Sequence, residues 1–164
     1  MKDLKHLYTF EKLLEEANNE LVKKATQDGG IALGYTCYHI PEVLLNCGNC
    51  FSVRLRAPRT GSMDIATYYM SNFLCGYSKA ILERAIEGGY NFLGGVLASE
   101  TCSEMNRSLE HFELLKLVDN DKFFLTFLDM PFKVADHTVK YYVKQTRNKI
   151  LNKISENYGV DTSD

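Results

Sequence analysis

The sequence predicts an α/β domain with a mostly parallel sheet of about four strands and helices on both faces. Short apolar runs alternate with longer amphipathic segments along residues 29–158, and Gly, Asn or Asp separates most of them. The apolar run at residues 123–128 has a single polar side chain, which is typical of a strand buried on both faces. A chain of 164 residues is long enough for one such domain with its own core.

The N-terminal segment predicts a helix that precedes the sheet. Residues 4–24 carry apolar side chains at helical spacing with charged residues between them. The run Asp28-Gly29-Gly30 ends this helix. We therefore expect residues 1–28 to form an N-terminal helix and residues 29–164 to form the α/β domain.

Periodicity places the remaining elements. Pro41 is a favourable first-turn residue for a short helix, and Gly88-Gly89 ends a later helix. The last helix carries an apolar stripe that begins at Val139 and ends at Tyr158. The expected strands span residues 31–35, 51–55, 92–98 and 123–128, the expected helices span 42–46, 78–87, 104–117 and 135–158, and a polar loop covers 56–62.

Composition and charge exclude several classes of function. The formal net charge is −2 and no strongly basic stretch is present, so we expect no nucleic-acid partner. No apolar run reaches the roughly 18 residues of a transmembrane helix, and the charged start of the chain does not resemble a secretory signal peptide. We therefore expect a cytoplasmic protein without a membrane partner, whose five cysteines stay reduced.

Three cysteines stand in equivalent places, each before a predicted helix. Cys37 follows the first strand, Cys102 follows the third strand, and Cys75 precedes the helix at 78–87. The carboxyl ends of parallel strands and the N-termini of helices meet at one rim of such a sheet, where ligands bind. Helix dipoles favour thiolates and anionic cofactors there. Three thiolates with a vacant fourth position suit an iron–sulfur cluster, and zinc is the alternative.

Cys47 and Cys50 fall on the opposite rim, between a helix and the second strand. Their C-x-x-C spacing is that of thioredoxin-like redox sites, but in those sites the motif follows a strand and opens a helix. Here the order is reversed. We therefore interpret this pair as ordinary packing rather than as a redox or metal site.

Six short segments match, in order, the motifs of one protein family. They are GYTCYHIPEVL at 34–44 (G-x-x-C-x-x-x-P-E-E-L), FSVRL at 51–55 (P-V-R-L), SNFLCGYSK at 71–79 (L-C-x-x-x-R/K), YNFLGGV at 90–96 (Y-D-F-L-D-G-V), TCS at 101–103 (T-C-D) and LDMP at 128–131 (L-D-x-P). Together they resemble the 2-hydroxyacyl-CoA dehydratase and benzoyl-CoA reductase family. The sequence departs from the motifs at Val43, where the family has a second Glu, and at Ser103, where it has Asp.

The resemblance implies a three-layer, Rossmann-like fold and a [4Fe–4S] cluster bound through Cys37, Cys75 and Cys102. It also implies an activity, the removal of water from (R)-2-hydroxyacyl-CoA by a one-electron, ketyl-radical route. The implied partners are a CoA-thioester substrate, a second dehydratase subunit and an ATP-dependent [4Fe–4S] activator protein. Because family subunits have a second α/β domain, we expect the chain to be the N-terminal, cluster-binding part of a subunit, inactive by itself, with a cluster that is lost in air.

Two alternatives to this function stay open. The chain is an ATP-dependent reductase component of the double-cubane-cluster or benzoyl-CoA reductase type, or it is a non-catalytic α/β remnant whose cysteines bind nothing.

Residues near Cys37 have two interpretations each. Glu42 is the candidate catalytic residue, handling substrate protons, or it offsets the dipole of its own helix. His39 donates a hydrogen bond that tunes the cluster, or it lies in a surface loop.

The same holds for side chains elsewhere in the chain. Arg54, Arg56 and Arg59 form a basic group that meets CoA phosphates or solvent. Tyr68, Tyr69, Phe73 and Tyr77 lie around Cys75, as packing or as a wall that excludes water from a reduced cluster. His111 and His137 lie among charged residues of predicted helices, so we expect both to be solvated.

Overall fold

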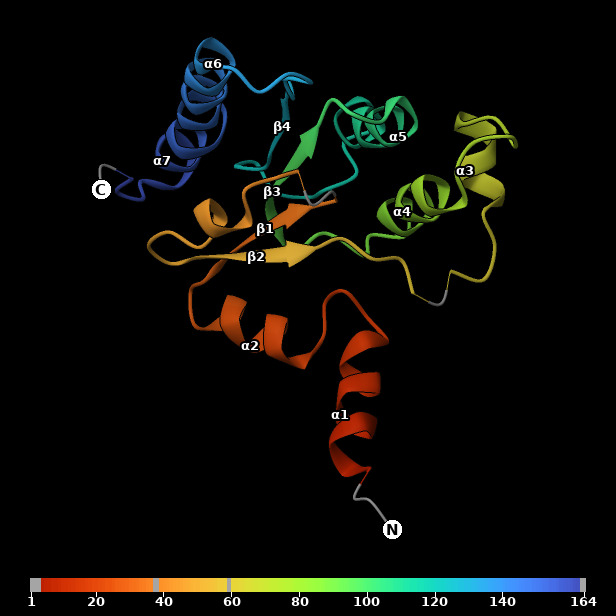
Figure 1. Cartoon of the computed structure of the whole chain (residues 1–164). Coiled ribbons are helices and arrows are strands. Elements are labelled where there is room, and N and C mark those ends of the chain that lie inside the picture. The colour runs from red at the N-terminus through yellow and green to blue at the C-terminus, as the bar shows by residue number, and fades with distance from the viewer. Residues whose placement is uncertain (1–3, 37–38, 59, 163–164) are drawn as a thin grey trace.

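A four-stranded, all-parallel sheet forms the centre of the computed structural model, which describes residues 4–36, 39–58 and 60–162. The strand order is β2-β1-β3-β4 (Figure 1). The strands are β1 (Ile31–Tyr35), β2 (Cys50–Arg54), β3 (Leu93–Ser99) and β4 (Phe124–Leu128). Each predicted strand differs from the observed one by no more than one residue at either end, so the four strand predictions are confirmed.

Helices cover both faces of the sheet, which gives three layers (Figure 1). One face carries α3 (Asp64–Tyr69), α4 (Gly76–Ile86) and α5 (Ser103–Leu114). The other face carries the 3₁₀ turn η1 (Glu42–Leu45), α6 (Asp136–Thr146), the π-helical turn η2 (Arg147–Leu151) and α7 (Asn152–Tyr158). Two further helices, α1 (Lys5–Leu14) and α2 (Glu20–Gln27), precede β1. This is the predicted α/β, Rossmann-like architecture. None of the helices described is both long and apolar enough to cross a bilayer.

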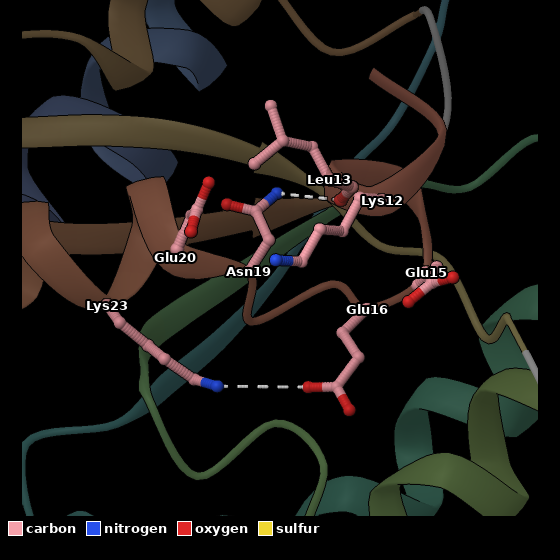
Figure 2. Close-up of a pocket in the computed structure, with 7 residues that line it drawn as sticks. All are labelled: Lys12, Leu13, Glu15, Glu16, Asn19, Glu20 and Lys23. Carbon is pink, nitrogen blue, oxygen red and sulfur yellow. Dashed lines mark hydrogen bonds and ion pairs between the residues drawn. The ribbon is translucent and has the colours of Figure 1, made fainter. Parts of the chain in front are cut away.

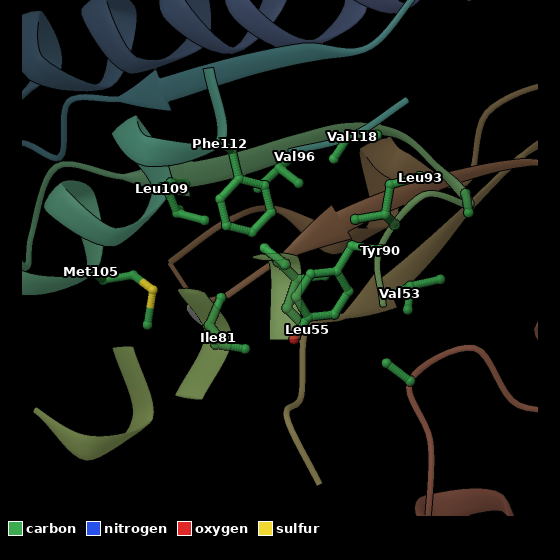
Figure 3. Close-up of a cluster of buried hydrophobic side chains, with 14 residues drawn as sticks. Val53, Leu55, Ile81, Tyr90, Leu93, Val96, Met105, Leu109, Phe112 and Val118 are labelled. Carbon is green, nitrogen blue, oxygen red and sulfur yellow. The ribbon is translucent and has the colours of Figure 1, made fainter. Parts of the chain in front are cut away.

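Two apolar clusters join the layers. On the α4 and α5 face, Ile81 and Phe112 belong to the cluster that includes Val96 of β3 (Figure 3). On the other face, Ile150 and Ile154 of the C-terminal helical run pack in a cluster with strand residues of β1 and β3. Strand β3 is buried along its whole length, because it has a strand on each side and helices on each face.

Strand β4 is an edge strand, and the prediction that it is buried on both faces was wrong. Phe124 and Leu128 are buried within the cluster that contains the C-terminal helices. Leu125 and Phe127 point to the other face and are only partly covered. The apolar run therefore reflects contacts on both faces, and the edge position leaves one face half-open.

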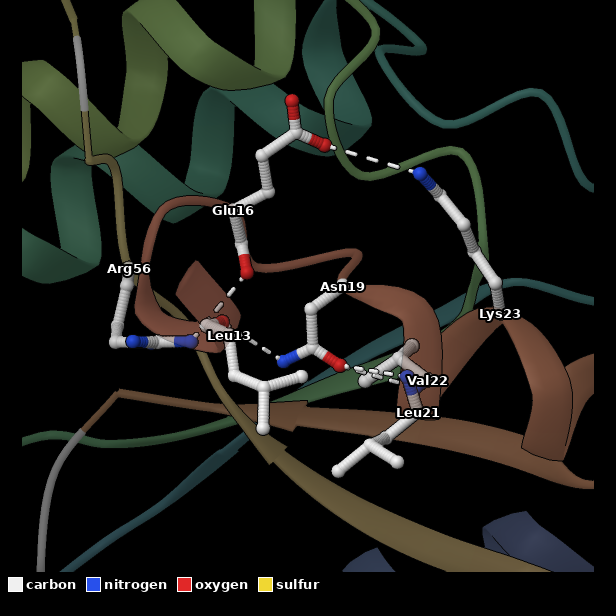
Figure 4. A network of polar contacts seen from close by, with 7 residues as sticks. All are labelled: Leu13, Glu16, Asn19, Leu21, Val22, Lys23 and Arg56. Atoms are coloured by element: carbon white, nitrogen blue, oxygen red, sulfur yellow. Dashed lines mark hydrogen bonds and ion pairs between the residues drawn. The ribbon is translucent and has the colours of Figure 1, made fainter. Parts of the chain in front are cut away.

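The single N-terminal helix predicted over residues 4–24 is wrong, because the chain breaks at Asn19 into α1 and α2. The Oδ1 atom of Asn19 accepts hydrogen bonds from the N–H groups of Leu21 (3.0 Å) and Val22 (3.2 Å), which is an N-cap (Figure 4). Its Nδ2 atom donates to the carbonyl of Leu13 (3.0 Å) at the end of α1. The junction leaves a polar hollow between the two helices (Figure 2).

Helix α3 is an element that the sequence analysis does not predict. Its six residues are too few to show a helical period, so its position depends on contacts with α4. Glu83 of α4 accepts a hydrogen bond from the N–H of Ala66 (2.6 Å), and Lys79 Nζ donates to the carbonyl of Asn72 (3.0 Å). Both charged side chains are buried. They hold the segment that leads from α3 to Cys75.

His111 is buried, so the prediction that it is solvated was wrong. Its exposed fraction is 6%, and the ring of Tyr69 lies against it with 5.5 Å between centroids. Burial lowers the pKa of His111 below its usual 6.5, and the nearby charge of Arg107 lowers it further. Tyr69, which covers His111, belongs to α3, the helix that the sequence analysis does not predict. His137 is exposed, as predicted.

The C-terminal helical run is continuous, but its predicted apolar stripe does not face the core throughout. Ile150 and Ile154 are fully buried, whereas the side chains of Val139 and Val143 are 51% and 59% exposed. The π-helical turn η2 separates the two pairs. A π turn inserts one additional residue, which rotates the helix after the turn by about 100° relative to the helix before it.

We predict that Asn19→Ala lowers the free energy of unfolding by about 1 kcal/mol, because α2 loses its N-cap and α1 loses its C-terminal contact. Urea denaturation measures the loss. Asn157→Ala is the matched control, since Asn157 is half-buried and its amide donates to the carbonyl of Lys153 within its own helix, α7. Equal stability of Asn19→Ala and the control would show that the break between α1 and α2 does not depend on the cap.

Candidate functional site

Cys75 and Cys102 lie in one cavity, at the rim formed by the carboxyl ends of the strands. Cys75 is the residue directly before α4, and Cys102 is the residue directly before α5. The cavity has a volume of about 200 Å³. It is lined by Thr36, Arg54, Cys75, Tyr77, Ser78, Cys102 and Met105. Two of the three cysteines predicted to converge are therefore brought together although they are distant in sequence.

Cys37, the third predicted ligand, lies outside the residues that the structure describes. Its described neighbour Thr36 lines the cavity. Farther along the segment, the carbonyl of His39 accepts a hydrogen bond from the hydroxyl of Tyr142 in α6 (3.0 Å). This bond joins helix α6 to His39, two positions after Cys37 in the sequence.

Glu104 links the two cysteine-bearing segments directly. It lies in the first turn of α5, two residues after Cys102, and its Oε2 atom accepts a hydrogen bond from the N–H of Cys75 (3.2 Å). The hydroxyl of Ser78 donates to the carbonyl of Cys75 (2.8 Å). Both backbone groups of Cys75 are thus held, while the thiols of Cys75 and Cys102 are exposed.

Two helix N-termini and one arginine lie at this rim. Helices α4 and α5 both start at this rim, and the N-terminus of a helix carries a positive partial charge. Arg54, the last residue of β2, adds a full positive charge to the cavity wall. The carboxylate of Glu104, bonded to the N–H of Cys75, adds a negative charge beside the start of α4.

The predicted candidates outside the cysteines mostly lie elsewhere. Glu42 does not line the cavity: its carboxylate accepts from the hydroxyl of Ser52 (2.8 Å) and is hydrogen-bonded to Tyr35, whose pKa is raised first by burial and then by Glu42. The catalytic role of Glu42 stays a prediction.

Some of the predicted arginine and aromatic residues line the cavity and others do not. Arg56 contacts the carbonyls of Leu14 and Glu16 at the end of α1, both at 3.4 Å, and Arg59 lies outside the described residues. Of the two described arginines, Arg54 lines the cavity and Arg56 does not. Among the aromatic side chains, Tyr77 lines it, whereas Phe73 is 98% exposed.

Cys47 and Cys50 lie at the opposite rim, where β2 begins, as predicted. Cys50 is buried in the apolar cluster that contains the C-terminal helices, and Cys47 packs against that cluster. Burial raises the pKa of the Cys50 thiol to about 12, and the neighbouring Cys47 contributes to the shift. Such a thiol is inert at neutral pH.

No group of three His, Cys, Asp or Glu side chains surrounds a common metal position within residues 4–36, 39–58 and 60–162. Two described thiols share the cavity, and the third predicted ligand lies outside these ranges. The ligand set therefore stays a prediction.

The sequence analysis did not identify five residues of the site, which are Thr36, Ser78, Glu104, Met105 and Tyr142. Glu104 follows Cys102 within one helical turn, which is a signal that could have identified it, and Thr36 precedes Cys37 directly. Tyr142 is more than a hundred positions away from its partner His39, and no local pattern indicates that contact.

Fold and cavity together define a parallel α/β domain with a cysteine-lined cavity at the carboxyl ends of its strands. The chain belongs to the family described as 2-hydroxyglutaryl-CoA dehydratase, D-component, which matches residues 37–164. It is also similar to the (R)-phenyllactyl-CoA dehydratase beta subunit of Clostridium sporogenes, with 26% identity over 114 residues. That alignment covers 70% of this chain and 30% of the relative, so the chain spans about a third of the relative's length. The family resemblance drawn from the motifs is confirmed.

We predict that a thiol-alkylating reagent modifies Cys75 and Cys102 of the folded apo-protein at pH 8 and leaves Cys50 unmodified. The two rim thiols are exposed, whereas a thiol with a pKa near 12 is about one ten-thousandth thiolate at that pH. Peptide mapping by mass spectrometry measures each rate. Alkylation in urea is the control, in which Cys50 reacts at a rate similar to Cys75. Rapid labelling of Cys50 in the folded protein would contradict the assigned burial.

Proposed function

We propose that this chain is the cluster-binding part of a 2-hydroxyacyl-CoA dehydratase subunit, with Cys37, Cys75 and Cys102 as ligands of a [4Fe–4S] cluster. The observation that carries the proposal is the shared cavity of Cys75 and Cys102 at the N-termini of α4 and α5. Family membership supports the same assignment.

The residues present suit such a cluster. Cysteine thiolates are the usual ligands of [4Fe–4S] clusters, and the cluster with its thiolates is an anion. Two helix N-termini and Arg54 offer positive charge at that place. Structural zinc sites draw their ligands from closely spaced cysteine pairs, and Cys75 and Cys102 are not such a pair.

When bound, the cluster would supply one-electron transfer to the thioester carbonyl of the substrate. The chain's own residues hold and shield it. Glu104 and Ser78 fix the backbone of Cys75, and Tyr142 holds the carbonyl of His39. Tyr77 and Met105 contribute apolar surface to the cavity, which limits the access of water to a reduced centre.

The wider proposal concerns the substrate and the partners. The substrate would be an (R)-2-hydroxyacyl-CoA thioester that loses water without net oxidation, by way of a ketyl radical. The relative is named a dehydratase and a beta subunit, which favours dehydration over the reductase alternative and indicates a second subunit. An ATP-dependent activator protein would supply the electron. We propose Arg54 as the member of the basic group that meets negative charge at the cavity.

Anaerobic reconstitution with iron and sulfide tests the proposal. We expect about four iron atoms per chain and an electron paramagnetic resonance signal after reduction. Cys37→Ser, Cys75→Ser and Cys102→Ser should each lose most of this iron. Cys47→Ser is the matched control, since Cys47 lies at the opposite rim and should leave the iron content unchanged.

Three outcomes would contradict the proposal. Absence of iron in the unchanged protein favours the non-catalytic remnant. Retention of one zinc ion in place of iron favours a structural metal site. Full iron content in both Cys75→Ser and Cys102→Ser would place the cluster elsewhere.

A further inference from the structure

We propose that Thr36 is a positioning residue whose hydroxyl donates a hydrogen bond to the group held by Cys75 and Cys102, and thereby raises its reduction potential. The inference rests on the proposed function, and it concerns a side chain that the ligand assignment does not use. It starts from a buried polar atom that lacks a partner.

Thr36 follows β1 directly and is 5% exposed. Its Oγ1 atom is buried and makes no hydrogen bond to any residue that the structure describes. Leaving a hydroxyl unpaired inside a protein costs about 1–3 kcal/mol, and most buried hydroxyls therefore have a partner. The backbone at this point is fixed, because the carbonyl of Tyr35 accepts from the N–H of Leu55 (2.8 Å).

The residue that carries the unpaired hydroxyl is one of those that line the cysteine cavity. Three described hydroxyl-bearing residues line the cavity, and two of them use their protons on backbone carbonyls. Tyr77 donates to Leu55 (2.7 Å), and Ser78 donates to Cys75 (2.8 Å). Thr36 is also a cavity-lining residue, and its proton has no acceptor among the residues that the structure describes.

An iron–sulfur cluster would supply the missing acceptor. Its sulfides and thiolate sulfurs accept hydrogen bonds, and their negative charge increases when the cluster takes up an electron. A donor within reach therefore stabilises the reduced state more than the oxidised state and raises the reduction potential. Arg54 acts in the same direction through its charge, but only Thr36, among the described residues of the cavity wall, offers a buried donor without a partner.

A purely structural role for Thr36 predicts something different. If the hydroxyl only fills space, Thr36→Val keeps the shape of the side chain and leaves the reduction potential of the cluster unchanged. The variant then differs from the unchanged protein only in stability. Stability and potential thus separate the two interpretations.

The experiment uses the full chain, reconstituted anaerobically, with the midpoint potential followed by electron paramagnetic resonance during a redox titration. Thr36→Val should make reduction about tenfold less favourable, which is about 59 mV for a one-electron couple. Thr36→Ala should shift the potential in the same direction. Thr36→Ser keeps the hydroxyl and should restore the original midpoint.

Thr126→Val is the matched control. Thr126 is a buried threonine of the same sheet, on edge strand β4, and it does not line the cavity. Its substitution should leave the midpoint unchanged. Urea unfolding of the apo-proteins completes the comparison: Thr36→Val should be at least as stable as the unchanged chain, because a buried unpaired hydroxyl is removed.

Unchanged midpoints in cluster-loaded Thr36→Val and Thr36→Ala would overturn the inference and leave the proposed function standing. A midpoint in Thr36→Ser as low as in Thr36→Val would also overturn it. An unchanged chain that takes up no cluster overturns the proposed function itself, and the inference with it.

Discussion

Parallel pairing of the strands is the constraint on which the site depends. Because β1 and β4 both pair with β3 in parallel, the carboxyl ends of these strands meet at one rim, and the chain must cross a face of the sheet between strands. Two of these crossings contain α4 and α5, and both helices begin at that rim. Cys75 and Cys102 are the residues at which they begin. The meeting of the two cysteines is thus a consequence of the direction of the strands.

The helices also connect the stability of the fold to the position of the thiols. Lys79 and Glu83 are charged residues on the buried side of α4, and each holds part of the segment before Cys75. Glu104 then joins the start of α5 to the start of α4. A burial cost for these charges is offset by hydrogen bonds that no apolar residue could make. The buried charges of Lys79 and Glu83 thus help to position the segment that ends at Cys75.

Much of the fold and part of the site could be predicted from the sequence. Short apolar or alternating runs placed the four strands, although β4 is only partly covered on one face. The position of Cys75 and Cys102 before helices predicted their shared rim. Other features depend on distant contacts. Asn19 interrupts a pattern that is helical in its spacing, since Ala17 and Leu21 continue the period across the break. His111 looks solvated among charged neighbours until Tyr69 covers it.

The unpaired hydroxyl of Thr36 is a second feature that sequence analysis could not predict. In the sequence, only the position directly before Cys37 distinguishes Thr36 from other polar residues at strand ends. Only the packed structure reveals that its Oγ1 atom is enclosed, and that Tyr77 and Ser78 have already used their protons. Burial and hydrogen-bond partners belong to the assembled sheet, so they can be read only after the strands are in place.

The most direct measurement of the central claim is an anomalous difference map at the iron absorption edge, from anaerobically grown crystals of the reconstituted chain. The account predicts iron in the cavity between the N-termini of α4 and α5, bonded to the sulfur atoms of Cys75 and Cys102. Iron bound at Cys47 and Cys50, or iron that contacts neither rim cysteine, would contradict it.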